Sequence, residues 1–109
     1  MKKGEIWLFE FPSSNGHEQA GDRPAIVISA SSTANTVVII PFTTNLQSLR
    51  FPSTLAVNQS KENGLIEESV ALVFQIRAID KKRMIKQVGS LESKYLKEIE
   101  SMMKKLFGF

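Results

Sequence analysis

Residues 5–11 have the sequence Glu-Ile-Trp-Leu-Phe-Glu-Phe and are bounded by Gly4 and Pro12. A short run rich in aromatic and β-branched residues between two turn formers is typical of a β-strand. Similar apolar runs follow, and we expect strands in them as well. These runs cover residues 25–29 (AIVIS), 36–42 (TVVIIPF), 53–57, 69–79 and 85–88.

Two of these runs carry further information. Pro41 has no amide hydrogen, so it is expected at an edge or near the end of its strand. The run 69–79 (SVALVFQIRAI) is the longest, and we expect one continuous strand there. Because Gln75 and Arg77 alternate with apolar residues, both would point to one face of that strand.

The C-terminal segment has a different period. Apolar residues recur at helical spacing at Leu91, Tyr95, Leu96, Ile99, Met102, Met103 and Leu106. Ser90 is the expected N-cap, and Gly108 is the expected residue just past the helix. Strands followed by one helix, without β-α-β alternation, predict a mainly β protein. We expect a small antiparallel barrel or sandwich capped by the helix, as a single domain over residues 1–109.

The composition excludes several classes of site. The 109 residues contain no cysteine, which removes disulfide scaffolds, cysteine nucleophiles and thiolate metal sites. His17 is the one histidine, so a zinc site would need carboxylates for its other ligands, which is uncommon. No apolar run approaches the roughly 20 residues of a membrane helix, and no apolar stretch follows the basic N-terminus. We therefore expect a cytoplasmic protein without metal or cofactor.

The charge is unevenly distributed. The net charge is +3, yet residues 1–80 contain six Lys and Arg against eight Asp and Glu, whereas residues 81–109 contain eight against three. A basic cluster comprises Lys81, Lys82, Arg83 and Lys86. The cluster is either a solvated turn or a patch that attracts phosphate or an acidic partner.

Candidate functional residues lie at the predicted strand ends and in the loop 12–22, whose Gly-rich sequence favours a long loop. They are His17, Glu18, Arg23, Thr43, Thr44, Gln75 and Arg77. Each also has a purely structural interpretation: a surface histidine, an ion pair of Arg23 with Asp22 or Glu18, a threonine turn, or the solvated face of an edge strand. Residue types and spacing alone establish only a small β-rich domain with a basic cluster.

Three segments, however, resemble the MazF/PemK/Kid toxin family. The first is Gly4-Glu5-Ile6-Trp7 followed by Gly16-His17-Glu18-Gln19-Ala20-Gly21-Asp22-Arg23-Pro24, which resembles the family's opening strand and its G-[SH]-E-Q-x-G-x-R-P loop. The second is Ile39-Ile40-Pro41-Phe42-Thr43-Thr44, similar to the end of the family's third strand. The third is Gln75-Ile76-Arg77-Ala78-Ile79-Asp80, similar to a Q-x-R-x-I-D segment.

This resemblance implies an SH3-like β-barrel of the CcdB/MazF type with a C-terminal helix, acting as a homodimer. It also implies a toxin of a type II toxin–antitoxin system. Such a toxin is a metal-independent endoribonuclease that cuts single-stranded mRNA at specific sequences and so inhibits translation. A MazE/PemI-like antitoxin would cover the active site with its C-terminal segment.

The resemblance also implies residue roles. Arg23 is the main catalytic residue, because its guanidinium can stabilise a pentacoordinate phosphate through two donors. Thr43 hydrogen-bonds or orients the reacting group, with Thr44 as the runner-up, and His17 and Glu18 are candidates for proton transfer. The expected RNA-binding residues are Gln19, Thr44, Gln75, Arg77, Lys81, Lys82, Arg83 and Lys86.

One position departs from the family. Several members carry an acid just before the glutamine matched to Gln75, and here that residue is Phe74. His17, Glu18 or a water molecule would then be the base; alternatively Phe74 points into the core and the match is off by one, or the protein cleaves RNA weakly. A competing function is a non-catalytic binding module or a CcdB-like toxin that binds gyrase. The Arg23-Pro24 loop argues against it, because that function needs no arginine that grips phosphate.

Overall fold

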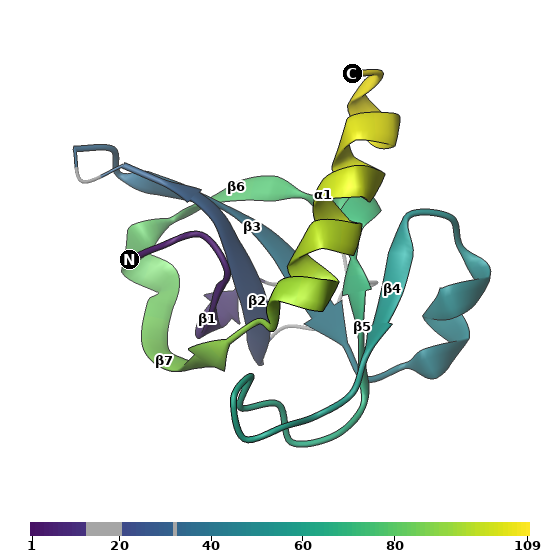
Figure 1. Ribbon diagram of the computed structural model, residues 1–109. Helices are drawn as coiled ribbons and strands as arrows, with labels where there is room; N and C mark the ends of the chain where they lie inside the picture. The colour runs from purple at the N-terminus through teal and green to yellow at the C-terminus, as the bar shows by residue number, and fades with distance from the viewer. Residues whose placement is uncertain (13–20, 32) are drawn as a thin grey trace.

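The computed structural model describes residues 1–12, 21–31 and 33–109. Their elements follow one another as strands first and a helix last, as expected (Figure 1). The strands are β1 (Glu5–Phe11), β2 (Gly21–Ala30), β3 (Thr36–Thr43), β4 (Thr54–Val57), β5 (Ser69–Leu72), β6 (Arg77–Asp80) and β7 (Met84–Ser90). Three 3₁₀ helices, η1 (Leu46–Arg50), η2 (Val73–Gln75) and η3 (Lys81–Arg83), join them, and the α-helix α1 spans Ser93–Phe107.

The strands form one seven-stranded sheet in the order β4-β5-β3-β2-β1-β7, with β6 also paired to β3. Every pair is antiparallel, as the missing β-α-β alternation predicted. No pairing joins β4 to β7 in the described part of the chain, so the barrel-like sheet is open. Figure 1 shows α1 lying across the curled sheet, with its C-terminal end projecting past the strands.

The prediction of one continuous strand over 69–79 is wrong. β5 pairs with the end of β3 through Phe42↔Ala71, and β6 pairs with the beginning of β3 through Ile39↔Arg77. Between these pairs β3 has two residues, 40 and 41, whereas the other segment has five, 72–76. The three extra residues are accommodated by η2. The run appears continuous in sequence because the residues of η2 and its flanks are as apolar as those of a strand.

The helix begins later than expected. Ser90 is the last residue of β7, where its N–H donates to the Glu62 carbonyl (2.9 Å), and it is not the N-cap because α1 begins only at Ser93. Glu92 occupies that position. The other end is confirmed, because Gly108 adopts φ 77° and donates its N–H to the carbonyls of Lys104 and Lys105.

Strand alternation divides the apolar residues between two faces. The helix face contains Ile6, Ile26 and Ile40, which pack with Ile99 of α1. The opposite face contains a second buried cluster that includes Phe9, Phe11, Ala25, Val27, Ile39 and Ile79. Because neighbouring residues of a strand point to opposite faces, the face of each functional side chain follows from its neighbours.

The segment between β4 and β5 is held by a buried asparagine. Asn63 is 0% exposed, and its Oδ1 accepts hydrogen bonds from the N–H groups of Ser60 and Leu65 (both 3.0 Å). Its Nδ2 donates to the Asn58 carbonyl (2.8 Å) and to Glu92 Oε1 (3.0 Å). The four bonds satisfy the buried amide of Asn63, so this side chain fixes the segment against the start of α1.

The same contacts set the charge state of Glu92. Burial raises the pKa of its carboxyl group, but hydrogen bonds from its own backbone, from Ser60 and from Asn63, together with the charge of Lys94, outweigh burial. The pKa of Glu92 therefore lies below its ordinary value.

Next to this cluster the backbone approaches β7 closely, since a Cβ on Gly64 (φ 72°) would lie 2.0 Å from the Val88 carbonyl oxygen.

Candidate functional site

Arg23 lies on the opposite face of the sheet. It pairs across β1 and β2 with Phe9, which belongs to the buried cluster of that face. Its guanidinium carbon is 5.2 Å from the centre of the Phe11 ring, within the range of a cation–π contact. The predicted loop 12–22 is shorter than expected at this end, because β2 already begins at Gly21. Arg23 is thus held on a strand and is half-buried.

Arg77 reaches the same ring from a distant part of the chain. It pairs with Ile39, which also belongs to the opposite-face cluster, and its guanidinium carbon is 5.0 Å from the centre of Phe11. Two guanidinium groups from β2 and β6 therefore lie against one aromatic side chain. Each of these planar cations can bind a phosphate group through two donors.

Thr43 is the last residue of β3. Its neighbour Phe42 packs in the helix-face core, so alternation places Thr43 on the face of Arg23 and Arg77. The Thr43 hydroxyl oxygen accepts a hydrogen bond from the Asn45 N–H (3.2 Å). A hydroxyl that accepts from the backbone still has its own proton to donate, for example to a phosphate oxygen. We call Arg23, Thr43, Arg77 and Phe11 the arginine site.

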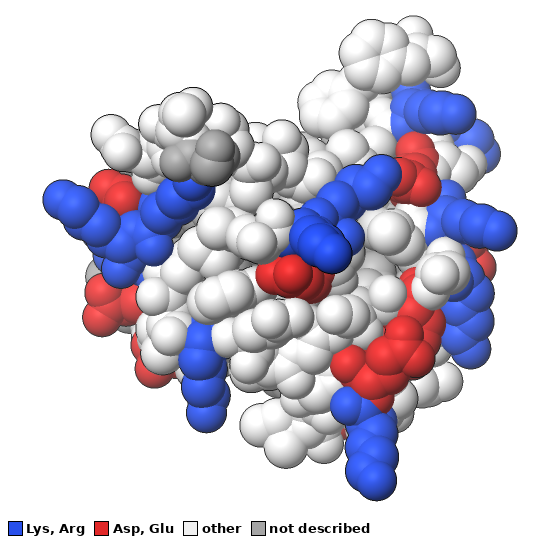
Figure 2. Space-filling model, turned by 60° about the vertical axis from the view of Figure 1, so that its left-hand side comes forward, with Lys and Arg blue, Asp and Glu red and all other residues white. Residues whose placement is uncertain are grey.

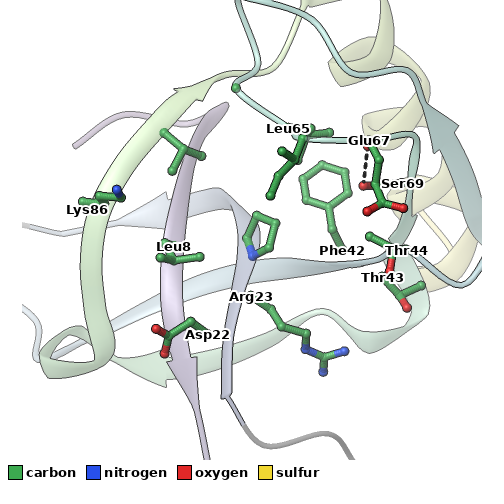
Figure 3. A pocket seen from close by; sticks show the side chains of 14 residues that line it. Leu8, Asp22, Arg23, Phe42, Thr43, Thr44, Leu65, Glu67, Ser69 and Lys86 are labelled. Atoms are coloured by element: carbon green, nitrogen blue, oxygen red, sulfur yellow. Dashed lines mark hydrogen bonds between the residues drawn. The ribbon is translucent and has the colours of Figure 1, made fainter.

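A cavity of about 490 Å³ borders the same strands and reaches the helix face, where Phe42 packs. Its wall includes Leu8, Pro24 and Phe42, and Figure 3 shows the Arg23 side chain extending away from Leu65 and Phe42. The remaining lining residues are Asp22, Arg23, Thr43, Thr44, Gly64, Leu65, Ile66, Glu67, Ser69, Lys86 and Val88. Arg23 and Thr43 of the arginine site are thus also lining residues of this cavity.

The structure divides the basic cluster. Lys81 Nζ donates to the Ser31 carbonyl, and Arg83 forms an ion pair with Glu10 (3.6 Å). Lys82 is exposed on η3, whereas Lys86 pairs with Leu8 and lines the cavity on the helix face. Figure 2 shows Lys and Arg interspersed with Asp and Glu, rather than one continuous basic face. The four residues therefore do not form one cluster, and of them Lys86 lines the same cavity as Arg23 and Thr43.

Phe74 and Gln75 lie in η2, so the alternation that put Gln75 and Arg77 on one face of a strand does not apply. Phe74 is 41% exposed, and its ring centre is 6.0 Å from that of Phe51. The alternative in which Phe74 points into the core is therefore wrong.

His17, Glu18 and Gln19 lie outside the described residues. Thr44, next to Thr43, is exposed at the cavity rim. The sequence did not indicate Phe11 as a site residue, although its alternation with Phe9 placed both on one face. Among the described residues no helix is long and apolar enough to cross a membrane, and no three His, Cys, Asp or Glu side chains are grouped to hold a metal ion.

Fold and site together define a small antiparallel β protein with a C-terminal helix and a cationic site suited to phosphate. The family model of PemK-like, MazF-like toxins of type II toxin–antitoxin systems matches residues 2–107, and the chain belongs to that family. It is 30% identical over 105 residues to a Staphylococcus saprophyticus protein named endoribonuclease MazF, covering 93% of this chain and 86% of the relative. The protein is thus a toxin endoribonuclease, which decides against the gyrase-binding alternative.

Solved structures support the fold. Crystalline MazF from Deinococcus radiodurans superposes with a TM-score of 0.81 at 23% identity, covering 100% of this chain and 97% of that one. A MazE–MazF structure from the same organism gives 0.76 at 24% identity, covering 100% and 96%. The expected SH3-like barrel of the MazF type is confirmed at the level of architecture, with the sheet left open as described above.

Proposed function

We propose that the protein cuts single-stranded mRNA at specific sequences by attack of a ribose 2′-OH, without a metal ion, and thereby inhibits translation. The observation that carries this proposal is the arginine site, in which Arg23 and Arg77 lie 5.2 and 5.0 Å from the centre of one phenylalanine ring on the face that carries Thr43. Positive charge held in place before the reaction stabilises the extra negative charge of a pentacoordinate phosphate.

The reaction is an in-line transfer within the RNA. The 2′-oxygen bonds to phosphorus and gives up its proton to a base, while the bond from phosphorus to the 5′-oxygen breaks and that oxygen takes up a proton. A 2′,3′-cyclic phosphate and a 5′-hydroxyl result. Arg23 stabilises the phosphoryl oxygens, Thr43 donates its hydroxyl proton to one of them, and Arg77 adds a second positive charge. His17 and Glu18 are the proposed proton-transfer groups.

The remaining proposed residues bind the RNA chain. Gln75 and Gln19 are suited to base edges or to positioning the chain, and Thr44 flanks Thr43. Lys82 and Lys86 have exposed ammonium groups that can bind phosphates, whereas Lys81 and Arg83 would first exchange the Ser31 and Glu10 contacts.

We take the proposed partners and cellular location from the family. A solved MazE–MazF structure is among those that resemble this chain. We infer that a cognate MazE/PemI-like antitoxin covers the site with its C-terminal segment, and that the toxin acts in the cytoplasm as a homodimer. Residues 1–109 would form one toxin domain in each protomer.

The test is cleavage of a single-stranded RNA in EDTA by the wild-type protein and by Arg23→Gln. Loss of one stabilising donor group costs about 10²- to 10³-fold in kcat, and we expect a loss of that size. Lys105→Gln, on the exposed last turn of α1, is the matched control for removal of one positive charge. An Arg23→Gln variant that is folded and as active as wild type contradicts the role of Arg23. Cleavage of RNA with a 2′-deoxy group at the scissile position contradicts the 2′-OH mechanism.

A further inference from the structure

Two aromatic side chains are exposed at the end of η1 and in η2. Phe51 and Phe74 are 44% and 41% exposed, although both rings are large and apolar. Their ring centres are 6.0 Å apart with an interplanar angle of 56°, and the guanidinium carbon of Arg50 is 4.9 Å from the centre of Phe51. We call Arg50, Phe51 and Phe74 the aromatic platform. All three side chains are exposed to solvent.

The backbone holds this platform in place. The Phe74 N–H donates to the Ser53 carbonyl (3.3 Å), and the Phe51 N–H donates to the Ser48 carbonyl (3.1 Å). Ser53 has φ 57°, a left-handed conformation that is uncommon outside glycine, and it lies in the turn that brings the two aromatic residues together. The backbone that carries the two rings is therefore held in place before a ligand binds, which lowers the ordering cost of stacking.

The platform lies on the same side of the sheet as the arginine site. Ala71 and Leu55 face each other and both pack on the helix face, so the next pair, Leu72 and Thr54, points to the opposite face. The Thr54 hydroxyl donates to the Phe51 carbonyl (2.8 Å), which ties the end of η1 over that face.

The chain connects the platform directly to the catalytic candidates. Asn45, whose N–H binds the Thr43 hydroxyl, is also the N-cap of η1 and accepts from the Gln47 N–H (3.1 Å). Phe74, the other aromatic residue of the platform, lies in η2, which ends two residues before Arg77. An RNA strand whose phosphate lies at the arginine site therefore has the platform within its path.

We propose that the aromatic platform is a subsite that stacks one base of the RNA strand next to the cleaved phosphate. Unstacked bases of single-stranded RNA bind to aromatic rings and to arginine planes, and every base offers a π face. Arg50 also adds positive charge for the flanking phosphate. This inference rests on the proposed function, because it assumes that the arginine site binds the scissile phosphate.

The test begins with the sequence that the wild-type protein cuts, obtained by sequencing the cleaved RNA ends. An oligonucleotide of that sequence carries a 2′-O-methyl group at the scissile position, so that it binds without being cut. Each base is then replaced in turn by an abasic site, and by 2-aminopurine, whose fluorescence falls when it stacks. Binding is compared for wild type, Phe51→Leu, Phe74→Leu and the control Phe107→Leu, an exposed phenylalanine at the end of α1.

We expect one flanking position at which 2-aminopurine is quenched by wild type and not by Phe74→Leu. An abasic site there should weaken wild-type binding about 5- to 150-fold and weaken Phe74→Leu binding far less. Phe107→Leu should behave as wild type. Absence of any quenched position on the wild-type protein overturns the subsite, and this readout does not depend on the folding of a variant.

The outcomes separate the two proposals. Wild-type protein that cuts RNA, together with folded Phe51→Leu and Phe74→Leu variants of unchanged KM, overturns the subsite and leaves the proposed function standing. Wild-type protein that cuts no RNA overturns the proposed function itself. Variants that lose affinity for an antitoxin peptide but not for RNA also overturn the subsite.

Discussion

Replacement of Asn63 by alanine should destabilise the protein more than any ordinary loop substitution. The side chain is 0% exposed, accepts two backbone hydrogen bonds through Oδ1 and donates two through Nδ2. Alanine removes all four bonds and leaves the N–H of Leu65, which is itself buried, without its partner. A buried polar group that loses its partner is costly, because water cannot replace the bond.

The magnitude follows from the four partners. Three of the bonds join neutral groups, worth about 1 kcal/mol each, and the fourth is to the Glu92 carboxylate, worth about 1.5–3 kcal/mol. The expected loss of unfolding free energy is therefore about 4–6 kcal/mol. Small domains have about 5–15 kcal/mol in total, so Asn63→Ala should be marginally folded at best.

The assay is urea unfolding followed by tryptophan fluorescence and circular dichroism. With a slope of about 1–3 kcal/mol per molar urea, the midpoint should fall by more than about 1 M. Asn58→Ala is the matched control, because Asn58 is exposed and its bonds to Tyr95 and Asn63 use backbone atoms. That variant should stay within about 0.5 kcal/mol of wild type. An Asn63→Ala midpoint equal to that of Asn58→Ala would refute the reasoning.

Two further predictions concern the same region. Gly64→Ala should lose more than about 3 kcal/mol, because its Cβ would lie 2.0 Å from the Val88 carbonyl at φ 72°, whereas Gly108→Ala, at φ 77° with open space around it, should lose only about 1–2 kcal/mol. Thermal melts compare the two, and equal losses would contradict the close backbone contact. The lowered pKa of Glu92 stabilises the fold above the unfolded pKa of about 4.3, and this stabilisation is lost as pH falls through the folded value. Between pH 6 and pH 3 the urea midpoint of wild type should thus fall more than that of Glu92→Gln, and parallel curves would argue against the shift.

Local patterns were sufficient for several elements. Runs of aromatic and β-branched residues next to turn formers predicted β1 over residues 5–11 with both ends correct, and β3 to within one residue. The helical period predicted α1, and Gly108 marked its end. These features depend on neighbouring residues along the chain, so a sequence contains the information for them. The motifs likewise singled out Arg23, Thr43 and Arg77 before any distances were known.

Other features depend on pairing between distant segments. β3 pairs with both β5 and β6, and the two pairings differ in register by three residues. This difference breaks 69–79 into β5, η2 and β6. Neither apolar content nor strand propensity reveals such a register. Ser90 has the chemistry of a helix cap, yet the pairing of β7 with β1 keeps it in the strand, and the helix starts after Glu92.

The arginine site combines both kinds of information. Sequence named Arg23 and Arg77 as separate candidates on two segments, but their meeting at Phe11 depends on the pairings of β2 with β1 and of β6 with β3. In the same way the chain's excess of positive charge at residues 81–109 indicated one patch, and the fold distributes its four clustered bases between Ser31, Glu10, solvent and the helix face. Residue identity determines which chemistry is available, whereas strand register determines which groups share a face, because a shift of one residue would move each side chain to the other side of the sheet.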